Sequence, residues 1–412
     1  MVKIAIIGAG AAGLIAAHFA AQSESAAVTL FEKNSFPGKK ILITGKGRCN
    51  VTNAAEIGTW ENEIPRGSKF LRTALYAFSP DKTRRFLEEA GVALKVERGG
   101  RVFPVSDRAR DVADALTRRA LESPRTALKT EKVLSVCAED GLFSVQTEKE
   151  TLRFDRVLIA TGGASYPGTG SDGDGYRFAR RLGHRITPLS PSLIPLLAQG
   201  DLCPSLMGLS LKNIAIRIET GAGKKVYEDF GEMLFSHFGV SGPVILSASA
   251  YLDFEKEPFY RLWIDLKPAL SEADLDRRIL SDFEENKNRD LVNSLSRLLP
   301  QKLIRPSLAL AQLEERKKVN LITKEERRRL VCLLKKFPVT LTGTRPLKEA
   351  IVTRGGVDLS EIDPRTMQSR KIPGLFFAGE ILDADGLTGG YNLQIAFSTG
   401  YLAGKNISKE ES

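Results

Sequence analysis

Three spaced glycines lie near the N-terminus, between a short apolar segment and a stretch with helical periodicity. Residues 3–7 have the pattern of a buried strand, Gly8-Ala9-Gly10-Ala11-Ala12-Gly13 follows, and residues 14–22 have an apolar helical face. In such a turn the first glycine permits a tight bend, the second lets the backbone approach a pyrophosphate, and the third allows close helix–strand packing. The helix N-terminus also favours the anion. The segment therefore predicts a β-α-β unit that binds a dinucleotide.

An acidic residue follows the next strand of this unit. Residues 28–31 have the pattern of a second strand, and Glu32 comes directly after them. A carboxylate about 20 residues beyond the glycine turn accepts hydrogen bonds from the adenosine ribose hydroxyls. We therefore expect the chain to begin with the nucleotide-binding half of a doubly wound α/β sheet.

Composition and length limit the class of protein. The 412 residues are 42% hydrophobic and 27% charged, which is typical of a soluble globular protein with two or three domains. Glycines and His18 interrupt the apolar residues 4–21, which argues against a signal peptide or a membrane span. Four scattered cysteines and three histidines predict no metal site and no disulfide framework. We therefore expect a cytoplasmic protein with no membrane partner.

The hydrophobic pattern in the middle of the chain differs from the pattern at its ends. Residues 156–160 and 374–378 are apolar runs that lead into glycines, and we expect both to be strands of the N-terminal sheet. Between them, residues 191–267 contain alternating stretches that indicate antiparallel strands, and residues 268–345 show helical periodicity. We predict a nucleotide domain made of residues 1–190 and 346–412, interrupted by an insert over residues 191–345.

The glycine turn alone does not distinguish FAD from NAD, because both cofactors present an ADP half to it. A Gly-acid pair, Gly379-Glu380, follows the strand near residue 377, and its backbone and carboxylate can meet a ribityl chain and a pyrophosphate. Residues 386–394 then lead into a helix that we expect to run to about Lys405, with its N-terminus aimed at the flavin N1 and C2 carbonyl. This late second contact favours FAD.

Two further glycine-rich segments suit a cofactor site. Residues 38–53 combine four cations, three glycines and several amides, which suits a loop around a diphosphate near a flavin edge. Thr161-Gly162-Gly163 suits a close backbone approach to the cofactor. Residues 168–173 also match a dinucleotide turn, but Tyr166-Pro167 separates them from the strand, so we interpret them as a loop near the flavin rather than a second site for NAD(P)H.

Together these motifs resemble one known family. Residues 8–13, Glu32-Lys33-Asn34, residues 38–53, residues 160–163 and residues 377–394 are similar to the BaiN/YhiN-like family of bacterial FAD-dependent oxidoreductases, also described as HI0933-like flavoproteins. The Gly-Arg-Cys-Asn-x-Thr-Asn string is the most specific element. The resemblance implies a two-dinucleotide-binding-type, Rossmann-like FAD domain with an inserted β-barrel-like and helical domain. It implies the cofactor more firmly than the reaction, because members are linked to bile-acid ring reduction and to amine oxidation.

The motifs and the resemblance yield a set of expected cofactor-binding residues. These are Gly8, Gly10, Ala12, Gly13, Glu32, Lys33, Lys40, Arg48, Asn50, Val133, Thr161, Gly162, Gly379, Glu380, Asn392 and Gln394.

Few residues are candidates for a direct catalytic role. His237, in the insert, and Tyr391, before the last helix, are our candidate catalytic acids or bases. Arg48 and Arg354 can bind a carboxylate or phosphate on the substrate. Cys49 is expected to be a packed thiol, because no resolving partner lies near it in sequence. Flavin chemistry needs no protein nucleophile, so the lack of a catalytic triad does not argue against an enzyme.

The predicted function is hydride transfer through flavin N5 to or from a small organic molecule, with NAD(P)H as a transient reductant. The net charge of +10 also permits an RNA-associated flavoprotein, such as a tRNA-modifying enzyme. Acids alternate with the basic residues of 297–336 and the aromatic residues expected for base stacking are missing there, so we rank nucleic acid second. A non-catalytic flavin-binding protein is a third alternative.

Overall fold

The computed structural model describes residues 1–409 and divides the chain into two compact units. The first unit comprises residues 1–192 and 346–412, and the second comprises residues 193–345. The sequence predicts the first of these boundaries after residue 190 and the second after residue 345.

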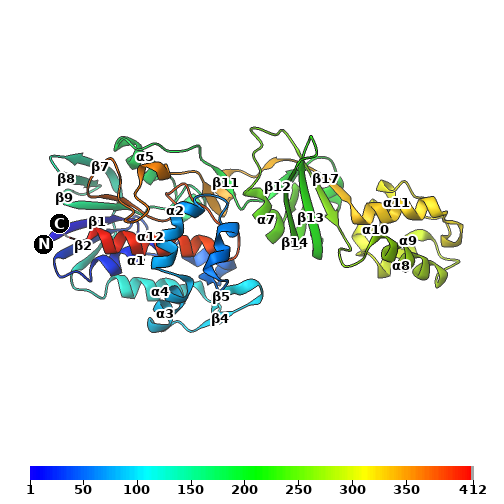
Figure 1. Cartoon of the computed structure of the whole chain (residues 1–412), viewed down its shortest axis with the longest axis horizontal. Helices are drawn as coiled ribbons and strands as arrows, with labels where there is room; N and C mark the ends of the chain where they lie inside the picture. Colours follow the sequence, from blue (N-terminus) through cyan, green and yellow to red (C-terminus); the bar gives the residue numbers. More distant parts are fainter. Residues whose placement is uncertain (410–412) are drawn as a thin grey trace. The chain divides into compact units, whose positions relative to one another are not determined.

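A five-stranded parallel sheet forms the centre of the first unit (Figure 1). Its strand order is β19 (Leu375–Phe377), β10 (Arg156–Ile159), β1 (Val2–Ile7), β2 (Ala26–Phe31) and β6 (Thr126–Lys129). The apolar runs at residues 156–160 and 374–378 therefore form neighbouring strands of the N-terminal sheet, as predicted. Their residues are almost fully buried because both faces of a parallel sheet are covered.

Two helices that are far apart in sequence pack together beside this sheet. Helix α1 (Ala11–Ala20) follows the glycine turn, and α12 (Tyr391–Ile407) lies alongside it (Figure 1). Added Cβ atoms at Gly400 and Gly404 would lie 2.4 Å from the Ala12 carbonyl oxygen and 2.5 Å from the Ala16 carbonyl oxygen. Only glycine permits this approach, and it brings the end of the chain against the nucleotide-binding turn.

The remaining elements of the first unit surround the sheet. Its other helices are α2 (Ser68–Ala77), α3 (Pro80–Glu89), α4 (Ala109–Ala120) and α5 (Asp174–Arg181). Two antiparallel sheets contain β3 (Thr52–Asn53), β5 (Arg101–Pro104) and β4 (Leu94–Val96), and β7 (Val133–Glu139), β8 (Leu142–Thr147) and β9 (Thr151–Phe154). Strand β11 (Ser190–Ser192) pairs with β18 (Val352–Arg354).

The second unit is a closed barrel with a group of helices. The barrel strands are β12 (Leu196–Ala198), β15 (Gly239–Ser241), β14 (Lys225–Ser236), β13 (Ser210–Thr220), β16 (Tyr260–Asp265) and β17 (Phe337–Thr344). Its helices are α6 (Leu202–Ser205), α7 (Pro243–Ser249), α8 (Glu272–Glu284), α9 (Leu291–Ser294), α10 (Gln301–Leu310) and α11 (Lys324–Lys335).

The second unit differs from the expected helical segment at its end. Residues 337–344 form β17 and complete the barrel, because Phe337, Val339 and Leu341 alternate into its core. At the N-terminus of α11, Thr323 and Glu326 form a capping box. Helix α12 ends at Ile407, close to the expected end near Lys405, and residues 410–412 lie outside the described part of the chain. No helix within residues 1–409 is long and apolar enough to cross a membrane, and these residues hold no cluster of three or more potential metal ligands.

Candidate cofactor site

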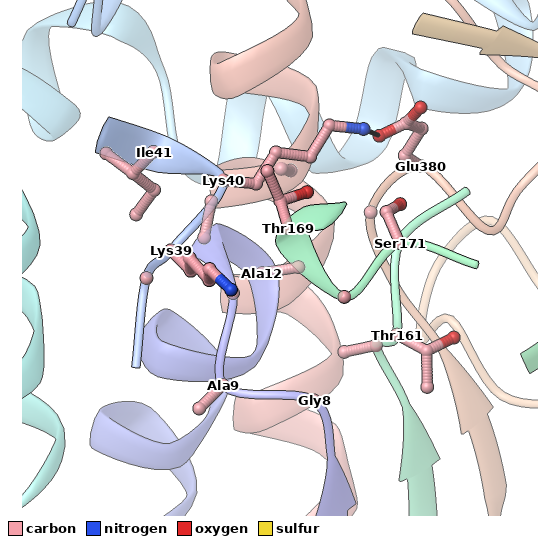
Figure 2. A pocket seen from close by; sticks show the side chains of 18 of the residues that line it. Gly8, Ala9, Ala12, Lys39, Lys40, Ile41, Thr161, Thr169, Ser171 and Glu380 are labelled. Atoms are coloured by element: carbon pink, nitrogen blue, oxygen red, sulfur yellow. Dashed lines mark hydrogen bonds and ion pairs between the residues drawn. The ribbon is translucent and has the colours of Figure 1, made fainter. Parts of the chain in front are cut away.

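A cavity opens at the carboxyl ends of the central strands, within the first unit (Figure 2). Its wall includes residues that follow β1, β2, β10 and β19, together with the start of α12. In open α/β sheets ligands bind in the crevice at this edge. The cavity is therefore the candidate site.

The glycine turn shapes one wall of the cavity. Gly8 has φ +104°, and a Cβ there would lie 2.6 Å from the Ala160 carbonyl oxygen. A Cβ at Gly13 would lie 1.9 Å from the Gly8 carbonyl oxygen, so this glycine allows α1 to begin against β1. At Gly10, by contrast, no described heavy atom lies within 4 Å of the Cβ position. The space beside Gly10 is a cradle that a side chain would fill and a pyrophosphate fits.

Glu32 is held at the same edge by its own loop. Its carboxylate accepts hydrogen bonds from the backbone N–H of Ala9 at 3.1 Å and of Asn34 at 2.8 Å, and from the Asn34 side-chain amide at 2.7 Å. The neighbouring Lys33 forms ion pairs with Asp172 at 2.6 Å and Asp174 at 3.0 Å. These contacts attach the segment after β2 to the loop before α5. A carboxylate fixed in this way can receive two ribose hydroxyls without further reorganisation.

Lys40 reaches Glu380 at another part of the cavity wall (Figure 2). The Lys40 ammonium lies 2.6 Å from one Glu380 oxygen and donates to the Ser165 hydroxyl at 2.7 Å. The other Glu380 oxygen accepts from Ser165 at 2.9 Å and from the Thr353 N–H at 2.9 Å. Burial on its own would raise the pKa of Glu380, but the Lys40 charge and these hydrogen bonds outweigh it and hold the pKa below its ordinary value. Glu380 is thus a partly buried carboxylate that stays ionised.

Two residues that line the cavity carry a buried hydroxyl group without a partner. Within residues 1–409, Thr161 Oγ1 and Ser171 Oγ have no hydrogen-bond partner, and both residues line the cavity. An unpaired buried hydroxyl costs free energy, so its place in a cavity wall points to a polar ligand. Together with the cradle at Gly10 and the fixed Glu32, the donor set fits an adenine dinucleotide.

Most of the predicted cofactor-binding residues come together in the cavity wall. They are Gly8, Gly10, Ala12, Glu32, Lys33, Lys40, Val133, Thr161, Gly162, Gly379, Glu380 and Asn392.

The other predicted cofactor-binding residues lie around this wall rather than in it. Gly13 packs against Gly8. Arg48 pairs with Glu97 and Asp107 and stacks on the Phe103 ring, and so braces its loop. Asn50 packs against Gly45, and Gln394 is buried among Thr52, Phe78 and Ser398. Their contacts hold elements that form the wall.

The two candidate catalytic residues have different surroundings. Tyr391 is buried edge-on against Trp60 with ring centroids 4.7 Å apart, outside the cavity wall, and burial raises the pKa of its hydroxyl. His237 is exposed in the turn between β14 and β15 of the second unit.

Cys49 is fully buried, and burial raises its pKa to about 12. A thiol in this environment stays protonated near neutral pH, so it is poorly suited to attack a flavin.

Several cavity residues carried no signal that we used in the sequence. They include Phe31, Glu131, Asp174, Phe178, Ile351, Val352 and Ala384. Phe31 is the last residue of β2, so its place beside Glu32 could have marked it. Ile351 directly precedes β18 and Val352 is its first residue, and only the tertiary structure brings this strand to the edge of the cavity.

Two later glycine-containing segments lie at or beside the cavity. Thr169, Gly170 and Ser171 line the same cavity as the first glycine turn, which agrees with the interpretation of residues 168–173 as a cofactor loop. Gly390, at the start of α12, packs against β3, because its Cβ position lies 2.3 Å from the Thr52 carbonyl oxygen. A valine at position 390 would therefore first displace β3.

Comparison with known proteins agrees with this geometry. The family described as HI0933-like protein Rossmann domain matches residues 2–406. A 3-dehydro-bile acid delta(4,6)-reductase from Clostridium scindens is 32% identical over 98% of both chains. A ribosomal RNA dihydrouridine synthase from Escherichia coli is 31% identical over 99% of this chain and 98% of its own.

Solved structures resemble the fold at low sequence identity. An E. coli quinol fumarate reductase subunit has a TM-score of 0.51 at 19% identity, over 99% of this chain and 70% of that one. The 3-ketosteroid delta1-dehydrogenase of Sterolibacterium denitrificans has a TM-score of 0.51 at 13% identity, over 99% of this chain and 100% of that one. The cavity and the match along nearly the whole sequence lead to one conclusion: the chain belongs to the HI0933-like family and is an FAD-dependent oxidoreductase.

Proposed function

We propose that this protein is a reductase that saturates a carbon–carbon double bond conjugated to a carbonyl group. The observation that carries the proposal is that the names of two of its relatives imply reduction of the same kind of bond. A delta(4,6)-reductase of a 3-oxo steroid acts on double bonds conjugated to the ring ketone. A dihydrouridine is uridine saturated at C5–C6, a bond conjugated to the C4 carbonyl. The shared chemistry is hydride addition to a carbon–carbon double bond that is polarised by a conjugated carbonyl group, at the β carbon in a simple enone or uracil.

The cavity residues suit the two ends of FAD. The group around Glu32 would hold the adenosine, and the glycine turn would hold the pyrophosphate. Apolar residues near the Lys40–Glu380 pair, namely Ile41, Ile351 and Val352, would cover the isoalloxazine ring. When bound there, FAD supplies hydride from its reduced N5. We infer that NAD(P)H reduces it transiently.

A small cyclic enone is our first candidate substrate, and a uracil base in RNA is the second. The second is favoured by the net charge of +10 and by the two relatives named ribosomal RNA dihydrouridine synthase. The exposed His237 and the buried Tyr391 stay candidate proton donors. If His237→Gln loses turnover while its flavin is still reduced normally, the result supports His237 as the proton donor.

Anaerobic reoxidation of the flavin tests this function. The purified protein is reduced with NADH or NADPH until its visible absorption bleaches, and then mixed with a 3-oxo-Δ4 steroid or with unmodified ribosomal RNA. We expect one of these acceptors to restore the oxidised spectrum with formation of the saturated product. Saturated analogues of each serve as controls. Reoxidation by neither acceptor, with rapid reoxidation by oxygen alone, would contradict the proposal.

Glu32→Gln should weaken FAD retention. The amide keeps the size of the side chain but loses the charge that accepts hydrogen bonds from the ribose, which is worth about 1–3 kcal/mol. The dissociation constant should therefore rise by roughly tenfold or more. It is measured by flavin fluorescence during titration of the apoprotein. An unchanged dissociation constant would remove Glu32 from the cofactor site.

A further inference from the structure

A cluster of charged side chains lies beside the cavity, and the cofactor contacts described above do not use it. It comprises Arg66, Ser192, Arg354, Asp383 and Asp385, and we call it the Asp385 cluster. Asp385 is only 1% exposed, and its Oδ2 accepts a hydrogen bond from the Ser192 hydroxyl at 2.6 Å. Arg66 Nε lies 3.6 Å from Asp385 Oδ1; burial raises the pKa of this carboxyl group, and the Ser192 hydrogen bond and the charges of Arg66 and Arg354 oppose that rise.

The cluster adjoins the part of the wall assigned to the flavin ring. Ser192 on β11 lies opposite Val352 on β18, and Val352 lines the cavity. Ala384, directly before Asp385, also lines the cavity. Gly67, directly after Arg66, has its Cβ position 2.8 Å from the Ala384 Cβ. Asp383 and Asp385 are therefore next in sequence to a wall residue, Arg354 is two positions from one, and Arg66 is connected to the wall through the contact of Gly67 with Ala384.

The cluster is incompletely satisfied. Arg66 Nε, Asp383 Oδ1 and Asp385 Oδ1 are buried and have no hydrogen-bond partner within the described residues. The Arg66–Asp385 distance is too long for a hydrogen bond, although it is short enough for attraction between the charges. The Arg66 side chain is 34% exposed, so its guanidinium extends from the buried carboxylate toward solvent. A charged donor held in this way is available to a polar ligand.

We propose that Arg66 and Arg354, oriented by Asp385, bind the carbonyl oxygen of the substrate. This inference rests on the proposed function. Asp385 is a positioning residue in this arrangement, because it touches the guanidinium and is itself sealed from solvent. A fixed guanidinium near the reacting carbonyl stabilises negative charge where it develops.

The reaction balances with these groups. A hydride from the reduced flavin adds to the β-carbon, the double-bond electrons move toward the carbonyl, and the carbonyl oxygen gains negative charge. Arg66 and Arg354 stabilise that oxygen while the α-carbon takes a proton from water. The flavin is oxidised, the double bond is reduced, and NAD(P)H restores the flavin.

Binding of a phenol tests the site without turnover. The 4-chlorophenolate anion carries a delocalised oxygen charge like that of the enolate, and it gives long-wavelength charge-transfer absorption when stacked on oxidised flavin. We expect the FAD-loaded wild-type protein to bind 4-chlorophenol as the phenolate with this absorption. Arg66→Met and Arg354→Met should each raise the phenolate dissociation constant about tenfold, the loss of one charged hydrogen bond. Asp385→Asn should raise it less, with FAD retention unchanged in all three variants.

Arg72→Met is the matched control, because Arg72 is an exposed arginine whose ion pair is with Glu61. It should leave phenolate binding within twofold of wild type. If Arg66→Met and Arg354→Met bind phenolate like the control while remaining FAD-loaded, the assignment is overturned. If either variant loses FAD, the Arg66→Lys or Arg354→Lys protein replaces it, and retention of phenolate binding supports the assignment.

The two proposals fail in different ways. If wild type binds phenolate through Arg66 but neither the enone nor RNA reoxidises the flavin, the anion site stands and the proposed reaction does not. If an acceptor reoxidises wild type and Arg66→Met at equal rates, the reaction stands and the role of the Asp385 cluster is rejected.

Discussion

Gly10→Val is expected to abolish FAD binding in a protein that still folds. The Gly10 backbone has φ −85°, which any residue can adopt, and its Cβ position is open. A valine side chain would therefore occupy the cradle for the pyrophosphate without a clash inside the apoprotein. We expect the FAD dissociation constant to rise by more than about 100-fold, or roughly 3 kcal/mol. Flavin fluorescence titration and thermal unfolding of the apoprotein measure the two effects.

Gly13→Ala provides the contrasting control. Its Cβ would lie 1.9 Å from the Gly8 carbonyl oxygen, a backbone atom that cannot move aside without displacing the turn. This variant should lose apoprotein stability, by about 1–3 kcal/mol for overpacking, as well as FAD affinity. Equal loss of apoprotein stability in Gly10→Val and Gly13→Ala would show that Gly10 has a packing role and does not face the cofactor.

Lys40→Met is expected to change how stability depends on pH. In wild type the Glu380 pKa is lowered, so this carboxylate contributes stability that is present above the ordinary glutamate pKa of about 4.3 and is lost as pH falls through the lower folded value. Without the Lys40 ammonium, burial raises the Glu380 pKa instead, and the charged form becomes a cost as pH rises. The variant should therefore be about 1–3 kcal/mol less stable than wild type at pH 7, and close to it near pH 3.

Urea unfolding of both apoproteins between pH 3 and pH 7 measures this difference. Lys39→Met is the matched control, because Lys39 also lines the cavity but makes only a 3.5 Å contact with Asn34. Its stability difference from wild type should be small and independent of pH. A pH-independent difference for Lys40→Met would mean that Lys40 acts through packing of its stem rather than through its charge on Glu380.

Parts of the site that depend on short sequence segments could be predicted. The glycine turn, Glu32 and the Gly379-Glu380 pair each combine a residue type with its position at a strand end, and all line the cavity except Gly13, which packs beneath it. Arg48 could not be assigned in this way. Its charge suits a phosphate, but in the folded chain its guanidinium donates hydrogen bonds to the carboxylates of Glu97 and Asp107.

The sequence by itself determined the dinucleotide turn, the class of cofactor and the existence of a β-rich and helical insert, because each depends on local periodicity or on residues a few positions apart. Only the tertiary structure decided which polar groups meet. Lys40 and Glu380 are 340 positions apart, and Ser192 and Asp385 are 193 apart. Their contacts arise because β18 and β19 return to the sheet edge where the first strand ends, and no local pattern encodes such a meeting. Residues 337–344 join the barrel for the same reason, because β17 pairs with β16, a strand that lies before the intervening helices in sequence.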